Sequence, residues 1–105
     1  MQTLRQDAQV IIDRALQDTQ PGPAVRRAMA KFRRPAGRII LIAAGKAAWQ
    51  MAKAAYDALD GAAICGAVIT KYGHLRGPIG PLELFEAGHP VPDANSFRAA
   101  QRALA

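Results

Sequence analysis

The chain has 105 residues, half of them hydrophobic, and a formal net charge of +6. This length allows no more than one domain, and the hydrophobic share excludes an intrinsically disordered protein. Its single cysteine, Cys65, cannot form an internal disulfide, which favours a reducing compartment. The sequence shows no secretory signal, and no apolar run approaches the roughly 20 residues that span a bilayer. We therefore expect a cytoplasmic protein with no membrane partner.

Two helices are predicted at the N-terminal end. From Thr3 to Asp18 the apolar residues recur at helical spacing and form one stripe, with Thr3 placed to cap the first turn. Proline and glycine residues at positions 21–23 end this helix. A shorter helix is expected from about Pro23 to Phe32, because proline suits a first helical turn.

Basic residues are concentrated around the end of the second helix. Six of the fourteen lie between positions 26 and 38: Arg26, Arg27, Lys31, Arg33, Arg34 and Arg38. Such a cluster is compatible with a nucleic acid or an acidic partner. Phe32 is the one aromatic residue among these charges, so bases would find little to stack on. A solvated helix end followed by a linker explains the cluster without a partner.

The centre of the chain has the pattern of a strand, a helix and a second strand. An apolar run over Ile39–Ala44 stops at Gly45-Lys46, and helical periodicity follows to Leu59. A second apolar strand, which would bury Cys65, is expected over Ile64–Thr70. This order predicts parallel strands. The helix should bury Ala48, Met51, Ala52, Ala55 and Leu59. Lys46 would lie at the carboxyl edge of the sheet and at a helix N-terminus, where anions bind.

A loop over 71–81, a third strand over 82–87 and a final helix complete the chain. The loop starts at the same sheet edge as Lys46 if the strands are parallel, and the sequence leaves the direction of the third strand open. Asp93, or the pair Asn95-Ser96, would cap the final helix. The chain ends within this helix, which we interpret as a truncation. The expected fold is α/β: a Rossmann-like layered sheet of about three strands flanked by helices, forming part of a domain.

Several well-known site motifs are missing from the sequence. A Walker A loop is excluded because Gly37 is too far from Gly45 and Ala47 replaces the required Ser or Thr. The G-x-G-x-x-G fingerprint is absent, and two histidines with one cysteine give no metal-ligand spacing. Three polar turns at the sheet edge remain: Gly45-Lys46, the loop from Lys71 to Arg76, and Gly88 to Ser96. Together they would suit a small anionic substrate and phosphate.

Three segments carry a family resemblance. The sequences AAGKAAWQMAKAA, VITKYGH with GPIG, and EAGHPVPDANS, in this order and spacing, closely resemble the N-terminal part of the MOFRL-type glycerate kinases. The similarity extends from Leu4 to Leu104. Family members phosphorylate glycerate with ATP, usually to 2-phosphoglycerate, and many relatives carry the older label hydroxypyruvate reductase. Family proteins are much longer and have two domains. Residues 1–105 would therefore be the N-terminal part of the N-terminal α/β domain, with the C-terminal domain as the missing partner.

The resemblance also implies roles for individual residues. Lys46 would be the catalytic residue, acting on the transferred phosphoryl group. The implied substrate-binding residues are Gly45, Lys71, His74, Gly88, His89, Asp93, Asn95 and Ser96. Glycerate would be the substrate, and ATP and Mg²⁺ the cofactors, with the metal supplied by ATP and not by a ligand set of this chain. Because the second wall of the cleft is absent, we expect the isolated chain to be inactive.

Two other functions stay open at this point. The parent protein could be a hydroxypyruvate reductase that uses NAD(P)H, although the missing glycine fingerprint argues against a dinucleotide site. The chain could instead be a basic binding module, as the cluster between Arg26 and Arg38 suggests.

Overall fold

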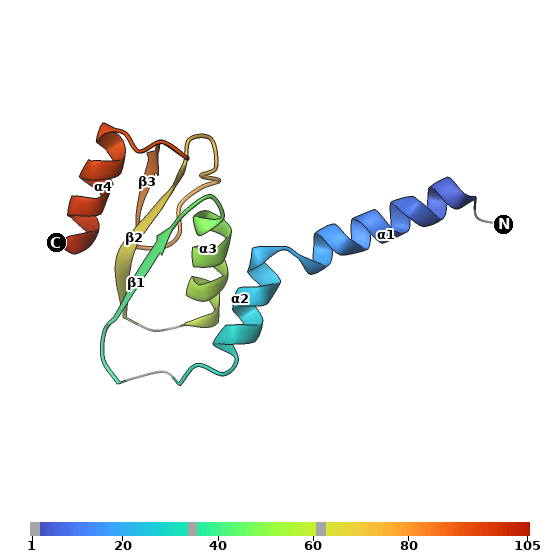
Figure 1. Cartoon of the computed structure of the whole chain (residues 1–105). Helices are drawn as coiled ribbons and strands as arrows, with labels where there is room; N and C mark the ends of the chain where they lie inside the picture. The colour runs from blue at the N-terminus through green and yellow to red at the C-terminus, as the bar shows by residue number, and fades with distance from the viewer. Residues whose placement is uncertain (1–2, 34–35, 61–62) are drawn as a thin grey trace.

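The computed structural model describes residues 3–33, 36–60 and 63–105 (Figure 1). Its elements, in chain order, are α1 (Leu4–Asp18), α2 (Pro21–Met29), β1 (Ile39–Ala44), α3 (Ala48–Ala58), β2 (Ile64–Lys71), β3 (Glu83–Ala87) and α4 (Ala94–Leu104). The predicted α/β class is confirmed. Arg34 of the basic cluster lies outside the described residues.

The three strands form one sheet in the order β1-β2-β3, and both pairs are parallel. Ile39 pairs with Ile64 at the start of β1, and Lys71 pairs with Ala87 at the ends of β2 and β3. The direction that the sequence left open for the third strand is therefore parallel. In such a sheet the carboxyl ends of all strands meet at one edge, so the segments that follow β1, β2 and β3 leave the sheet on the same side.

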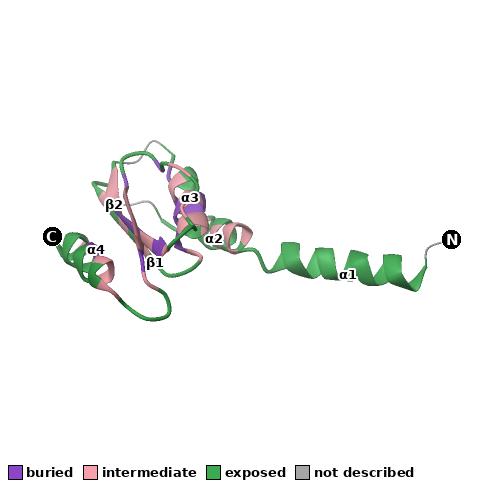
Figure 2. Cartoon of the chain, turned by 90° about the horizontal axis from the view of Figure 1, so that it is seen from above, coloured by how far each residue is buried: buried purple, intermediate pink, exposed green. Residues whose placement is uncertain are grey.

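Helices cover both faces of the sheet, as Figures 1 and 2 show. α3 packs on β1 and β2, α2 packs on the outside of α3, and α4 lies on the opposite face against β2 and β3. The core beneath α3 is built from Ala48, Ala52, Val68, Ile79 and Leu82. The alanines let the helix approach the sheet closely, since small side chains reduce the distance between packed elements.

The predicted buried face of α3 is correct at four positions and wrong at Met51, whose side chain is 43% exposed. Met51 lies beside Leu41 and Ala43 of β1, which is an edge strand, so this side of the helix extends past the sheet. Ala54 is buried instead, because α2 packs on that side of α3. Cys65, predicted to be buried, is only half-buried.

The first helix begins with a complete capping box. The Thr3 hydroxyl accepts the Gln6 N–H, and the Gln6 side chain accepts the Thr3 N–H. α1 nevertheless extends away from the rest of the chain, and all its residues are exposed (Figure 2). The predicted apolar stripe thus exists without a covering element among the described residues. α2 starts at Pro21, not Pro23, with proline in its first turn. Within the described ranges, no helix is long and apolar enough to cross a membrane.

Candidate functional site

The turn between β1 and α3 presents Lys46. Gly45 has a φ of 123°, a backbone region that residues with a Cβ rarely adopt. Its N–H donates to the carbonyl oxygen of Ile69 at 3.0 Å. The buried Thr70 hydroxyl donates to the Lys46 carbonyl oxygen at 3.2 Å. These bonds tie the turn to β2 and leave the Lys46 side chain exposed, outside every ion pair found among the described residues.

The first turn of α3 begins without a side-chain cap. Its N-cap residue is Ala47, which has no side chain to accept the N–H groups at the helix start. The Ala48 N–H donates to the Gly45 carbonyl oxygen at 3.2 Å. The remaining amides and the positive end of the helix dipole favour a negatively charged group beside Lys46.

The turn after β2 brings two further nitrogen-bearing side chains to Lys46. The His74 N–H donates to the Lys71 carbonyl oxygen at 3.1 Å, and the Gly73 N–H donates to the Glu86 carboxylate. The chain therefore folds back beside the sheet edge. One open pocket of about 300 Å³ lies at this edge. It is lined by Lys46, Gly73, His74 and Arg76, together with Pro21, Ala47, Trp49 and Gln50. The Trp49 indole N–H donates to the Gly77 carbonyl oxygen at 2.9 Å and fixes the far end of this loop to α3.

The turn between β3 and α4 uses its polar groups internally. Asp93 is the N-cap of α4, and its carboxylate accepts the Ser96 N–H at 3.1 Å while the Ser96 hydroxyl accepts the Asp93 N–H at 3.0 Å. A hydrogen bond from Tyr72 is the main reason that the pKa of Asp93 falls to about 2, and amide N–H groups of Gly88 and Ser96 lower it further. Asp93 is thus a charged carboxylate whose hydrogen-bonding capacity is already occupied.

The predicted site residues fall into two groups along the sheet edge. Lys46 and His74 line the same pocket, with Gly45 behind them. Lys71 ends β2 and is half-buried. The predicted residues after β3 are not among the residues that line this pocket, since β2 separates β3 from β1: Gly88, His89, Asp93, Asn95 and Ser96. Position 88 has room only for glycine, because a Cβ there would lie 2.4 Å from the Val91 carbonyl oxygen. His89 is exposed and precedes a cis proline.

Sequence reasoning missed three contributors to this edge. Arg76 is not among the predicted site residues, although an arginine in the loop that leaves a strand at the carboxyl edge is a usable signal. Thr70 lies in an apolar strand, and nothing in its neighbourhood along the chain marks its bond to Lys46. Tyr72 bonds to residues more than twenty positions away, which local patterns do not reveal.

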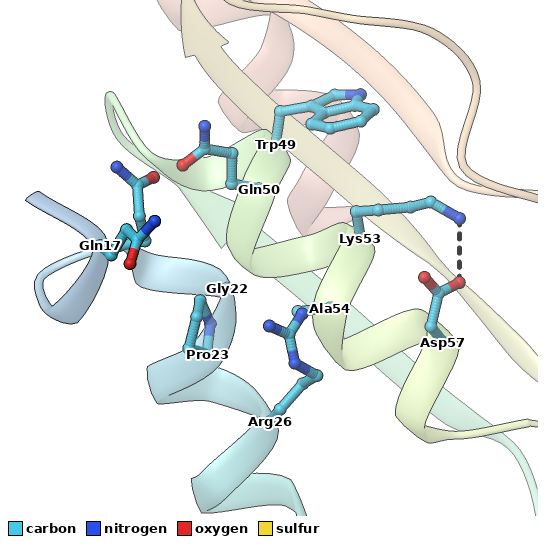
Figure 3. Close-up of a pocket in the computed structure, with 10 residues that line it drawn as sticks. Gln17, Gly22, Pro23, Arg26, Trp49, Gln50, Lys53, Ala54 and Asp57 are labelled. Carbon is cyan, nitrogen blue, oxygen red and sulfur yellow. Dashed lines mark hydrogen bonds and ion pairs between the residues drawn. The ribbon is translucent and has the colours of Figure 1, made fainter. Parts of the chain in front are cut away.

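A separate hollow of about 400 Å³ lies between α2 and α3 (Figure 3). Arg26 reaches from α2 toward Ala54 of α3, and Lys53 forms an ion pair with Asp57 at 2.9 Å. Lys53 is neutralised by Asp57, and the hollow adjoins the Lys46 pocket, with which it shares Trp49 and Gln50, but neither Lys46, His74 nor Arg76 lines it. We therefore place the candidate site at Lys46. Within the described part of the chain, no three His, Cys, Asp or Glu side chains are grouped to hold a metal ion.

Comparisons with known proteins agree with this architecture. Residues 7–105 match the family described as a domain of unknown function, DUF4147. The chain is 44% identical over 103 residues to D-glycerate 2-kinase of Thermotoga maritima, which covers 98% of this chain and 24% of the relative. It is 40% identical over 101 residues to a putative hydroxypyruvate reductase of Agrobacterium vitis, covering 96% of this chain and 22% of the relative. A crystal structure of glycerate kinase from Thermotoga maritima superposes with a TM-score of 0.79 at 43% identity, over 92% of this chain and 23% of that one. The chain thus spans about a quarter of the length of these relatives.

Proposed function

We propose that this chain, which belongs to the DUF4147 family, the N-terminal domain of MOFRL glycerate kinases, supplies one wall of the cleft of an ATP-dependent glycerate kinase. The observation that carries the proposal is the pocket at the carboxyl edge of the sheet. There, Lys46 is exposed beside the uncapped start of α3 and faces a loop that bears His74 and Arg76.

Transfer of a phosphoryl group to glycerate requires stabilisation of negative charge on the transferred group and a fixed position for the attacking hydroxyl. Lys46 is suited to the first task, because its ammonium group is exposed and has no carboxylate partner among the described residues. Arg76 adds a guanidinium with a planar set of donors for phosphate or carboxylate oxygens. The backbone amides at the start of α3 add dipoles that need no reorganisation during the reaction.

The residues present fit the phosphates of ATP better than they fit a metal ion. The pocket offers cationic side chains and amide donors, which bind phosphate oxygens. It offers no carboxylate among the side chains that line it, so Mg²⁺ would enter with the nucleotide. Glycerate, with one carboxylate and two hydroxyls, is a second ligand that these donors suit. Asp93 and Asn95, which we predicted as substrate contacts, are proposed to act only indirectly, through Tyr72.

The isolated chain is expected to bind these ligands weakly and to lack turnover. A wall that covers about a quarter of the relatives' length leaves the pocket open to water, and phosphoryl transfer is favoured in a site from which water is excluded. A coupled assay for ADP release in the presence of glycerate checks this expectation. Turnover that disappears in the Lys46→Ala variant would contradict it.

The direct test of the pocket is a titration of the chain with ATP and with D-glycerate, followed by amide chemical shifts. Lys46→Ala should weaken ATP binding by about tenfold to a hundredfold, because charge-assisted hydrogen bonds contribute about 1.5–3 kcal/mol. Lys53→Ala is the matched control, since Lys53 lies on α3, the helix that follows Lys46, but forms an ion pair with Asp57. The proposal would be contradicted if the wild type and Lys46→Ala bound ATP equally, or if Lys46→Ala and Lys53→Ala lost the same affinity.

A hydroxypyruvate reductase is the second candidate, because a relative at 40% identity bears that name. A reductase would bind NAD(P)H, yet the β1–α3 turn has one glycine where a dinucleotide fingerprint has three. Saturable binding of NADH that outcompetes ATP at Lys46 would favour this candidate over the kinase.

A further inference from the structure

Tyr72 connects two loops that are far apart in the sequence. Its hydroxyl donates to Asp93 Oδ2 at 2.6 Å and accepts from the Asn95 amide nitrogen at 2.8 Å. Tyr72 is 47% exposed, so its side chain is not held by burial in the core. Its place is set by these two hydrogen bonds, which span from the first residue after β2 to the start of α4.

The partners of Tyr72 are themselves fixed. Asp93 caps α4 and accepts hydrogen bonds from both the N–H and the hydroxyl of Ser96, at 3.1 and 3.2 Å. The Asn95 side-chain oxygen accepts from the Arg98 guanidinium one helical turn later. Ala99, in the same helix, is fully buried against the sheet. The hydroxyl of Tyr72 is therefore anchored to a helix start that is capped, charged and packed.

On the other side, Tyr72 belongs to the turn that shapes the candidate site. The turn is closed by the bond from His74 to the Lys71 carbonyl oxygen and is tied to β3 by the bond from Gly73 to Glu86. His74 and Arg76 follow at once and line the pocket that contains Lys46. The turn thus has an inner tie to the sheet, through Glu86, and an outer tie to α4, through Tyr72.

We propose that Tyr72 is a positioning residue, which clamps the turn after β2 to the start of α4 so that His74 and Arg76 face Lys46. The proposal rests on the proposed function of the pocket, and it reassigns Asp93 and Asn95 from substrate contact to the support of Tyr72. A loop that is already held in its binding conformation loses less conformational freedom when a ligand arrives. Without the hydroxyl, the binding arrangement would be one of several, and affinity would fall in proportion to its population.

The experiment replaces Tyr72 with phenylalanine and measures amide hydrogen exchange together with ATP affinity. Tyr72→Phe keeps the ring and removes both hydrogen bonds. We expect exchange at His74 to accelerate and ATP to bind more weakly, each by roughly threefold to tenfold, the size of one or two lost hydrogen bonds. Tyr56→Phe is the control, because Tyr56 packs against the core and its hydroxyl lies beside Gly80, at the opposite end of the loop from Tyr72. This variant should change neither the exchange rate at His74 nor the affinity for ATP.

A double-mutant cycle distinguishes a clamp from a direct contact. Asp93→Asn keeps a good N-cap but replaces the oxygen that accepts from Tyr72 with an amide donor. If Asp93 acts through Tyr72, the double variant should bind ATP and D-glycerate no more weakly than Tyr72→Phe alone. Additive losses would assign Asp93 to the substrate and overturn the clamp.

Two further outcomes are decisive. Unchanged exchange at His74 in Tyr72→Phe would overturn the clamp, whatever the ligand data show. If the wild-type chain binds neither ATP nor D-glycerate, the proposed function fails, and the exchange rates alone decide whether Tyr72 holds the turn.

Discussion

Two strand-to-helix turns at the same edge of the sheet differ in how they use their polar groups. The β1–α3 turn presents an exposed Lys46 and has Ala47 as the N-cap of its helix, without a side-chain cap. The β3–α4 turn has Asp93 as the N-cap of its helix, with a complete capping box and a further bond from Tyr72. Both turns start with a glycine, and both had been predicted to contact substrate.

The difference shows why a polar turn at a carboxyl edge is not by itself a binding site. A helix N-terminus attracts anions because its first N–H groups lack partners. At α4 a carboxylate of the chain already occupies that role, so a second anion would meet a negative charge. At α3 the role is vacant, and Lys46 adds positive charge. The two turns therefore have opposite electrostatic character on one structural plan.

The largest effect is expected from a substitution that disrupts the β3–α4 turn. Gly88→Ala would place a Cβ 2.4 Å from the Val91 carbonyl oxygen and 3.0 Å from the Asp93 carboxylate. We expect a loss of about 1–3 kcal/mol in the free energy of unfolding, as for other overpacked sites, measured by urea denaturation. Val91→Ala is the control in the same turn, since its side chain is 75% exposed, and it should be nearly neutral. Similar losses in both variants would show that the close approach at Gly88 is not limiting.

A smaller effect should follow from giving the β1–α3 turn the charge of its counterpart. Ala47→Asp would place a carboxylate beside Lys46 at the start of α3. We expect ATP to bind about fivefold more weakly, because two exposed charges about 4 Å apart interact by about 1 kcal/mol. Ala47→Asn is the matched neutral variant. If it weakens ATP binding as much as aspartate does, shape and not charge explains the change.

The smallest expected effect concerns the pH dependence of the β3–α4 turn. The pKa of Asp93 is lowered from 3.8 to about 2 in the folded chain, chiefly by the bond from Tyr72. Between these values the unfolded chain binds more protons, so stability rises with pH there. The contribution of Asp93 is complete above about pH 4 and is lost as the pH falls through 2.

Thermal unfolding between pH 2 and 6 measures this contribution. The decline on acidification should be shallower in Asp93→Asn than in the wild type. It should not vanish, because the bond from Arg102 also lowers the pKa of Glu83. Identical profiles for the two proteins would mean that the Asp93 carboxylate is equally protonated in the folded and unfolded chains.

Much of the fold could be predicted because it depends on short-range pattern. The apolar run over Ile39–Ala44 and the helical spacing of the alanines in α3 are local signals that proved correct, and of the two caps predicted for α4 the structure has Asp93. The expectation that the turn with Lys46 and the loop with His74 lie at one edge followed from a general rule, that parallel strands bring their carboxyl ends to the same edge, and the two residues do line one pocket.

What the sequence determined by itself is therefore the set of elements, the parallel pairing of β1 with β2 and the carboxyl-edge position of Lys46. Tertiary structure alone decided the direction of β3, the exposure of Met51 at the edge strand and the bond that joins Tyr72 to Asp93. The physical reason is range. Propensity, capping and periodicity act within about one helical turn, whereas pairing, burial and side-chain bonds between loops depend on residues that only folding brings together.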